Sequence, residues 1–271
     1  MQSNISPNKL FVLIANRRTG SNYLMKVFDS FFEIEFFGEV YHWDTVWMPN
    51  HRKQEYVKWL KINQGININI GDKPFEDQEL VKFNHREPEH FLNFLGSSTP
   101  NKYAGFKIFP EHLSWQKLEK YLLSNKEITK IILKRNLLDV YISDKILQLT
   151  KHSQKYNTSN IKIDVDCIDF KKWYFETQSY YSNIEFYLKN SSQQYLELSY
   201  EDIHKYTSDE EKLSYIHSWF KQHNFEIREE INQSEFTTKQ DQRKNSIDKV
   251  QNAEEIKHYL YRNNLQYLIQ C

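Results

Sequence analysis

A short basic segment near the start of the chain contains the residue types that bind phosphate-like anions. It reads Asn16-Arg17-Arg18-Thr19-Gly20-Ser21-Asn22 and lies between an apolar run, Leu10–Ala15, and a helical pattern over 22–32. Backbone amides at a helix start lack intrahelical partners and attract anions. Gly20 allows close approach, Thr19 and Ser21 offer hydroxyl donors, and the two arginines offer forked charged donors. We therefore predict an anion site here, with an ordinary basic turn as the alternative.

A second basic segment, Lys134-Arg135-Asn136, follows the apolar run Thr129–Leu133. A helical pattern begins directly after it and carries Ser143 about two turns further on. Arg135 and Ser143 can therefore meet on a second anion. Alone this signal is weak, because an arginine often precedes an amphipathic helix. Two such segments after two strands are more informative, since the strands of a parallel sheet present their carboxyl ends at one edge.

Short strand patterns alternate with long helical patterns along the chain, and no linker or repeat interrupts them. This alternation predicts βαβ units and hence an α/β fold with a mainly parallel central sheet. We expect one domain over residues 1–271 with a helix-rich C-terminal half. The expected strands cover 10–15, 33–37, 103–109, 129–133 and 195–199. The expected helices cover 22–32, 111–124, 137–151, 166–189, 208–224 and 252–270, with shorter helical patches near 52–62 and 86–95.

The composition excludes several classes of protein. The chain has six glycines and six prolines, and neither residue occurs after Pro110. A turn-dense β-sandwich needs such residues at short intervals, so that class is excluded. Lys plus Arg and Asp plus Glu each number 36, which gives a net charge of zero. This balance argues against a nucleic-acid partner or a polybasic membrane footprint, although it permits a local basic pocket.

Cysteine content and hydropathy indicate the cellular setting. The two cysteines, Cys167 and Cys271, provide neither a disulfide framework nor a cysteine metal site. No apolar run approaches the roughly 20 residues that span a bilayer, and no signal-peptide pattern opens the chain. We expect a reduced, cytoplasmic protein without a transmembrane segment or a bound metal, and the oligomeric state stays open.

The two basic segments resemble the nucleotide-binding motifs of the sulfotransferases. Arg18-Thr19-Gly20-Ser21 looks like the 5′-phosphosulfate loop of that family, and Lys134-Arg135 with Ser143 looks like its 3′-phosphate motif. The likeness is strongest to bacterial carbohydrate and nodulation-factor sulfotransferases. The cytosolic steroid and phenol enzymes carry a glycine-rich C-terminal cofactor loop that this chain lacks. Other short segments also occur in the same order as in that family. They are Gly38-Glu39, Gly105-Phe106-Lys107, Tyr200-Glu201-Asp202 and a helix start with a capping-box signature, Asn252-x-x-Glu255.

The resemblance implies a P-loop-like, three-layer α/β fold that binds 3′-phosphoadenosine-5′-phosphosulfate (PAPS) and releases adenosine 3′,5′-bisphosphate (PAP), without a metal. The expected acceptor is a hydroxyl or amine of a carbohydrate or other small molecule. Transfer in line builds charge on the leaving phosphate, where preorganised arginines and amides stabilise it. The resemblance assigns the 3′-phosphate to Arg135 and Ser143, and the 5′-phosphosulfate to Arg17, Arg18, Thr19, Gly20, Ser21 and Asn22.

The proton of the acceptor needs a base, and Glu39 is the first candidate. It directly follows the second strand pattern, and Gly38 permits a sharp turn that aims it inward. In the enzymes that this chain resembles, a glutamate in this region has that role. His42 and His112 are the competing bases, with packing or surface histidines as the ordinary alternative. Lys107, near the end of the third strand, either faces the sulfuryl oxygens or pairs with an acid.

Two further segments of the sequence have a predicted role in ligand binding, and two other functions compete with sulfuryl transfer. The polar stretch Thr237–Lys249 contains Arg243 and Lys244, which by family analogy close over the nucleotide. Residues 43–100 hold tryptophans and histidines that suit sugar stacking, although core packing explains them equally well. A kinase is the competing enzyme, disfavoured because no Walker-type lysine precedes Ser21 and no Mg²⁺-binding acid is evident. A nucleotide-binding scaffold without activity is the competing non-enzyme.

Overall fold

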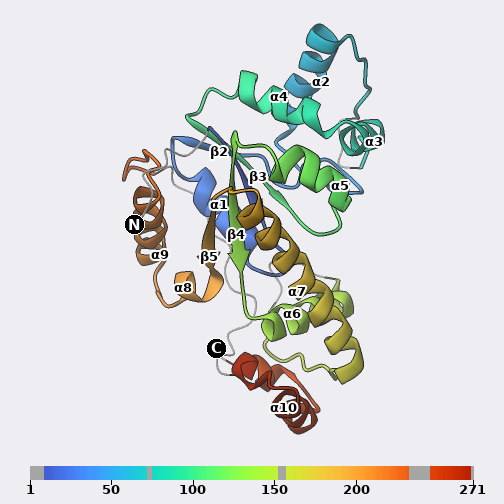
Figure 1. The fold of residues 1–271 in the computed structure, drawn as a ribbon, viewed down its shortest axis with the longest axis vertical. Coiled ribbons are helices and arrows are strands. Elements are labelled where there is room, and N and C mark those ends of the chain that lie inside the picture. The colour runs from blue at the N-terminus through green and yellow to red at the C-terminus, as the bar shows by residue number, and fades with distance from the viewer. Residues whose placement is uncertain (1–8, 72–74, 152–156, 232–244, 270–271) are drawn as a thin grey trace.

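The sheet has five strands, all parallel, in the order β2-β3-β1-β4-β5 (Figure 1). The computed structural model describes residues 9–71, 75–151, 157–231 and 245–269. Every expected strand is present within one residue of its expected bounds, and the α/β class with a central parallel sheet is confirmed. The strands are β1 (Leu10–Ile14), β2 (Ile34–Phe36), β3 (Tyr103–Ile108), β4 (Ile128–Lys134) and β5 (Tyr195–Ser199).

Helices fill the connections between the strands. The patch expected near 86–95 is divided between two helices, because Pro88 lacks a backbone N–H and starts a new one. The helix expected from residue 111 begins only at Trp115 and continues as a π-helix, and the last long helix ends at Arg262. The α-helices are α1 (Ser21–Asp29), α2 (Asn50–Gln64), α3 (Gln78–Arg86), α4 (Pro88–Ser98), α5 (Trp115–Lys117), α6 (Leu137–Thr150), α7 (Cys167–Asn190), α8 (Tyr200–His204), α9 (Asp209–Gln222) and α10 (Ala253–Arg262). The other helices are the π-helix Leu118–Leu123 and the 3₁₀ helices Ser246–Lys249 and Gln266–Ile269.

Helices cover both faces of the sheet. Along β1, Val12 and Ile14 face the side on which α2, α3, α4 and part of α7 pack. Phe11 and Leu13 face the opposite side, on which α1 and α9 pack. All four side chains are fully buried, which explains why the β1 sequence is a continuous apolar run. In Figure 1, α9 lies at the left of the sheet and α2, α3 and α4 lie at the upper right.

A third apolar cluster lies beyond the carboxyl ends of the strands. It joins α6, α7, α10 and the two 3₁₀ helices, which Figure 1 shows in the lower part of the molecule. The capping box expected at the start of α10 is wrong, because the Asn252 side chain makes no capping hydrogen bond there. Instead it accepts from the backbone N–H of Val165 at 2.9 Å and donates to the carbonyl oxygen of Val165 at 3.0 Å. Asn252 thus fastens the start of α10 to the segment that precedes α7.

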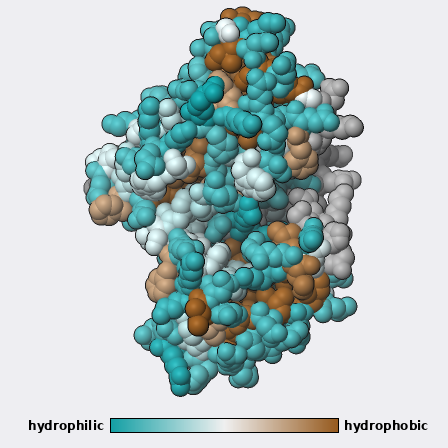
Figure 2. Space-filling view, turned by 90° about the vertical axis from the view of Figure 1, so that its right-hand side faces the viewer, coloured by the Kyte–Doolittle hydropathy of each residue, from teal (hydrophilic) through white to brown (hydrophobic). Residues whose placement is uncertain are grey.

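The face in Figure 2 is mostly hydrophilic, with hydrophobic side chains at its top and in its lower half. The exposed hydrophobic side chains Leu149, Ile168 and Phe175 belong to α6 and α7. No helix within the described ranges is long and apolar enough to cross a membrane.

β1 lies in the middle of the sheet, at the point where the connections diverge. After β1 the chain continues to β2 and β3 on one side, whereas β4 lies on the other side and is followed by β5 further out. The loops after β1 and β4 therefore leave the sheet in opposite directions. In open α/β sheets, ligands bind in the crevice that such a divergence leaves. Both basic segments of the sequence lie at this crevice.

Candidate functional site

The loop after β1 has an uncommon backbone conformation. Arg18 and Gly20 have positive φ angles of 63° and 89°, and Gly20 immediately precedes the first turn of α1. The hydroxyl of the fully buried Thr19 donates to the carbonyl oxygen of Asn16 at 2.7 Å. A Cβ atom at Gly20 would lie 2.5 Å from the ring of Tyr200. Glycine is therefore required between the loop and this ring, and Thr19 fixes the loop from within.

Three of the predicted side chains from the two basic segments meet at the crevice. Arg18 Nε donates to Ser143 Oγ at 3.0 Å, and Arg135 Nη1 donates to the carbonyl oxygen of Arg18 at 2.7 Å. The guanidinium carbon of Arg135 lies 3.9 Å from the centroid of the Tyr200 ring. We call Arg18, Arg135 and Ser143 the arginine cluster. The sequence predicts that Arg135 and Ser143 bind one anion, the 3′-phosphate, and that Arg18 binds the other, the 5′-phosphosulfate. In the structure, Arg18 contacts both Arg135 and Ser143 and so links them.

The arginine cluster holds two like charges that are largely removed from water. Burial lowers the pKa of Arg18, and nearby Arg135 lowers it further, whereas Asp144 acts in the opposite direction. Arg135 Nη2 lies 3.7 Å from an oxygen of Asp139. Its buried Nε has no hydrogen-bond partner within the described residues. Two adjacent guanidinium groups with an unused buried donor form a site that an anion would stabilise.

A second polar group forms between β2, β3 and α1. Gly38, with a φ of 74°, turns the chain directly after β2 and brings Glu39 beside Lys107 of β3. Lys107 Nζ lies 3.0 Å from Glu39 Oε1 and also donates to Asn22 Oδ1. His112 Nε2 lies 3.6 Å from Glu39 Oε2. We call Glu39, Lys107 and His112 the carboxylate cluster. Of the two roles considered for Lys107, the structure shows the pairing with an acid.

Both histidines near Glu39 already accept a hydrogen bond. His112 Nδ1 accepts from the backbone N–H of Phe109 at 3.2 Å, which places the ring hydrogen on Nε2, toward Glu39. His42 Nδ1 accepts in the same way from the N–H of Asp44 at 3.1 Å. Burial lowers the pKa of His112 to about 2, with His42 and Lys107 acting in the same direction. Burial also lowers the pKa of His42. Both rings are therefore neutral at neutral pH, and neither has an unused basic nitrogen.

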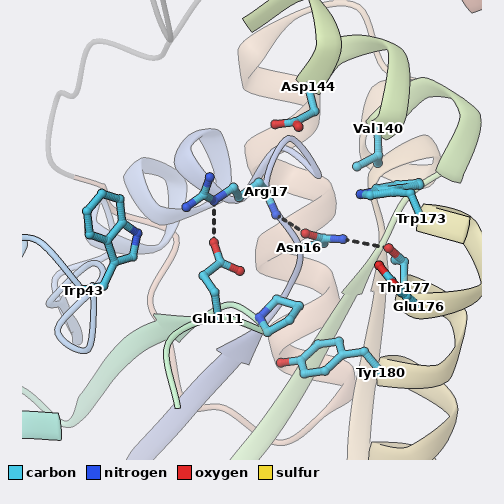
Figure 3. A pocket seen from close by; sticks show the side chains of 11 residues that line it. Asn16, Arg17, Trp43, Glu111, Val140, Asp144, Trp173, Glu176, Thr177 and Tyr180 are labelled. Carbon is cyan, nitrogen blue, oxygen red and sulfur yellow. Dashed lines mark hydrogen bonds and ion pairs between the residues drawn. The ribbon is translucent and has the colours of Figure 1, made fainter. Parts of the chain in front are cut away.

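A pocket of about 380 Å³ opens beside the arginine cluster (Figure 3). The β1 loop contributes Asn16 and Arg17, and Arg17 forms an ion pair with Glu111, which follows β3. Asp144 of α6 also lines the pocket and is adjacent in sequence to Ser143, so the pocket and the arginine cluster share α6. The aromatic and apolar parts of the wall come from Trp43, Pro110, Val140, Trp173 and Tyr180.

The remaining predicted residues have different surroundings. Arg17 lines the pocket and pairs with Glu111 rather than joining the arginine cluster. Ser21 is buried in the first turn of α1. Arg243 and Lys244 lie outside the described residues, so their closing role stays a prediction. Within the part of the chain that the structure describes, no group of His, Cys, Asp and Glu side chains is arranged to hold a metal ion.

Sequence reasoning did not single out Glu111, Trp173 or Glu176, all of which line the pocket. A signal was available for each of them. Glu111 comes directly after the third strand pattern, at the edge where ligands bind. Trp173 and Glu176 are three residues apart in a long helical pattern and therefore share one face of α7.

No protein-family model matches the sequence, and no curated protein matches it. Among solved structures, a sulfotransferase from Alicyclobacillus acidocaldarius is similar over 98% of this chain and 96% of its own, with 10% sequence identity and a TM-score of 0.46.

Proposed function

We propose that the protein is a sulfotransferase that transfers the sulfuryl group of PAPS to a hydroxyl or amine of a carbohydrate or other small molecule. The observation that carries the proposal is the arginine cluster. Arg18 and Arg135 lie 117 positions apart in the chain, yet they are in direct contact at the carboxyl edge of the sheet. Both belong to segments whose sequence resembles the two phosphate-binding motifs of that family.

The residues at the crevice fit a donor with two anionic ends. Arg135 has a buried Nε without a partner among the described residues. Arg135 also lies just before α6, the helix that carries the hydroxyl of Ser143. Gly20 is the N-cap residue of α1, and the first amides of that helix lack intrahelical partners. Arg18 contacts Ser143 and can contribute to both ends. In this proposal the 3′-phosphate is held by Arg135 and Ser143, and the 5′-phosphosulfate by Arg17, Arg18, Gly20, Ser21 and Asn22.

Glu39 is the base that the geometry supports best. His42 and His112 each accept a hydrogen bond at Nδ1 and carry their hydrogen on Nε2, whereas Glu39 is a carboxylate acceptor. Glu39 would take the proton from the acceptor hydroxyl or amine as that atom bonds to sulfur and the bond between sulfur and the 5′-phosphate oxygen breaks. PAPS supplies the activated sulfuryl group when bound, and PAP is the product that leaves.

Lys107 has two functions in this proposal. Its ammonium group is almost completely buried, and burial lowers its pKa, while Glu39 acts in the opposite direction. The contact with Glu39 keeps the carboxylate in place, and the contact with Asn22 brings the positive charge to the start of α1. A fixed charge at that position stabilises negative charge that develops on the leaving oxygens.

Thermal unfolding with two nucleotides tests the proposal. A ligand present at 100 times its Kd stabilises a protein by about 2.7 kcal/mol, which is a shift of several degrees for a chain of this size. We expect PAP to produce this shift and ATP with Mg²⁺ to produce a much smaller one. Stabilisation by ATP alone would favour the kinase and overturn the proposal. PAP binding without transfer of ³⁵S-labelled sulfuryl to any of a panel of acceptors would favour the inactive scaffold.

A further inference from the structure

The pocket beside the positively charged arginine cluster has a negatively charged lining. Three carboxylates line it, from Glu111, Asp144 and Glu176, together with one guanidinium, from Arg17. Arg17 and Glu111 form an ion pair, so their charges compensate each other. Asp144 and Glu176 then give the pocket a net negative lining. An anionic acceptor would be repelled here, whereas a cationic group would be attracted.

The two remaining carboxylates come from different helices that meet at the cavity. Asp144 of α6 accepts a hydrogen bond from Gln148 at 2.7 Å, and it lies close enough to Arg18 to raise the pKa of that arginine. Glu176 of α7 is exposed, and no ion pair within the described ranges includes it. Glu176 therefore offers the less compensated charge, and Asp144 lines another part of the same pocket (Figure 3).

Aromatic rings complete the walls of the pocket. Figure 3 shows Trp43 and Trp173 on opposite sides of the ion pair between Arg17 and Glu111. Trp43 is 57% exposed and stacks on His42 of the loop that carries Glu39. Indole faces pack against the apolar faces of sugars and attract cations. They therefore suit a ligand that combines a sugar ring with a positive charge.

One buried polar atom in the pocket wall also lacks a partner. The hydroxyl oxygen of Tyr180 is buried and makes no hydrogen bond to any residue that the structure describes. Burial raises the pKa of this hydroxyl, and nearby Glu111 acts in the same direction, so it remains a neutral donor and acceptor. A buried hydroxyl without a partner is a position at which a ligand hydroxyl gains a hydrogen bond.

From these features we infer that the pocket binds an amine-bearing carbohydrate, with its protonated amine near Glu176 and its sugar rings against the tryptophans that line the pocket. The inference rests on the proposed function in one respect, that the occupant of the pocket is the sulfuryl acceptor. The cavity volume lies in the range of small-molecule sites, which suits one or a few sugar units. His42 links Trp43 to the loop of the proposed base, Glu39, so a ring held at Trp43 lies close to that loop.

Binding of three sugars that differ in one substituent tests the inference. Glucosamine, N-acetylglucosamine and glucose are titrated into the wild-type protein by calorimetry at about pH 6, where the amine of glucosamine is protonated. We expect glucosamine to bind at least about fivefold more tightly than the other two sugars, the size of one favourable ion pair near a surface. This preference should decrease at high salt. Equal affinity for the three sugars would overturn the inference in favour of a neutral acceptor.

A variant and its control locate the charge that is responsible. Glu176→Gln should reduce the preference for glucosamine about fivefold and leave the affinity for glucose unchanged. Glu210→Gln, at an exposed glutamate on the distant α9, should change neither affinity. An unchanged preference in Glu176→Gln, with the thermal unfolding midpoint of the variant intact, would contradict the inference.

PAP is titrated separately into the same samples, which distinguishes failure of the inference from failure of the proposed function. Selective binding of glucosamine without binding of PAP would leave the pocket in place as a cation-binding site and overturn its role as an acceptor site. Binding of PAP with no preference among the sugars would leave the proposed function in place and overturn only the acceptor class.

Discussion

The arginine cluster and the carboxylate cluster lie at the same edge of the sheet, but their charges are arranged in opposite ways. Arg18 and Arg135 are two like charges, and a buried donor of Arg135 has no partner among the described residues. In the carboxylate cluster, Glu39 is already matched by Lys107 at 3.0 Å and lies 3.6 Å from His112. One cluster brings like charges together, whereas the other pairs opposite charges, and among the described residues its buried His112 Nε2 has no hydrogen-bond partner.

This difference separates binding from chemistry. A site with surplus like charge gains stability when an opposite charge enters, so changes in it should appear as changes in ligand affinity. A neutralised cluster that is fixed before the ligand binds contributes through the position of its groups in the transition state. Changes in the carboxylate cluster should therefore appear in kcat and in the pH dependence of stability.

The largest effect is expected from Glu39→Gln. Loss of a general base reduces kcat by about a hundredfold to ten-thousandfold, while the Kd for PAP should change by less than about threefold. Steady-state kinetics and calorimetry on the same preparation measure the two quantities. Lys107 loses its counter-charge in this variant, so Glu39→Asp, which keeps the charge but shortens the side chain, is measured in parallel and should also lower kcat. Unchanged kcat in both variants would exclude Glu39 as the base.

A smaller effect is expected from Arg135→Lys in the arginine cluster. The lysine keeps the charge but loses the fork and the stacking on Tyr200, so the Kd for PAP should rise about thirtyfold. Affinity for adenosine 5′-phosphate, which lacks the 3′-phosphate, should change by less than about twofold. Lys134→Gln is the matched control, because Lys134 pairs with Glu185 and Glu197 and not with the cluster. An equal loss of affinity for both nucleotides would contradict the assignment of Arg135 to the 3′-phosphate.

The smallest effect is expected from His112 and appears in stability. Its pKa is about 2 in the folded protein and 6.5 as the reference value, so below about pH 6.5 the unfolded chain binds a proton that the folded chain does not. Neutral His112 therefore makes its full contribution to the free energy of unfolding above that pH. This contribution decreases by about 1.4 kcal/mol per pH unit as the pH falls toward 2.

His112→Asn removes this contribution while keeping an acceptor for the N–H of Phe109. Between about pH 6 and 5 the wild-type protein should lose about 1.4 kcal/mol more of its free energy of unfolding than the variant does. Urea unfolding at several pH values measures the difference. His51→Asn, at an exposed histidine in the first turn of α2, is the control. Parallel curves for wild type and His112→Asn would show that His112 is not held neutral by burial.

Much of the fold could be predicted because its signals are local. The strands β1 and β4 each contain a short apolar run that is buried on both faces of the sheet, and each basic segment follows one of these runs. The helix starts were less predictable. Asn252 has the spacing of a capping box, but the backbone of Val165, 87 positions away, takes its side chain instead. A local pattern cannot reveal a tertiary partner that competes for the same amide.

The candidate site could be predicted by residue type but not by pairing. The sequence predicts that Arg18, Arg135 and Ser143 bind anions, yet the contact between Arg18 and Ser143 depends on β1 and β4 being neighbours in the sheet. The neutral state of His112 depends in the same way on burial and on the turn at Phe109. Strand order and burial are properties of the whole chain, and the sequence of one segment does not contain them.

Arg17 belongs both to the loop after β1 and to the wall of the pocket, where it pairs with Glu111. A guanidinium that turns toward an anion at the crevice gives up part of this pairing, and Glu111 then contributes its full charge to the pocket. We therefore expect an anion at the crevice and a cation in the pocket to bind with positive cooperativity. Thermodynamic linkage requires the same coupling free energy in either order of addition.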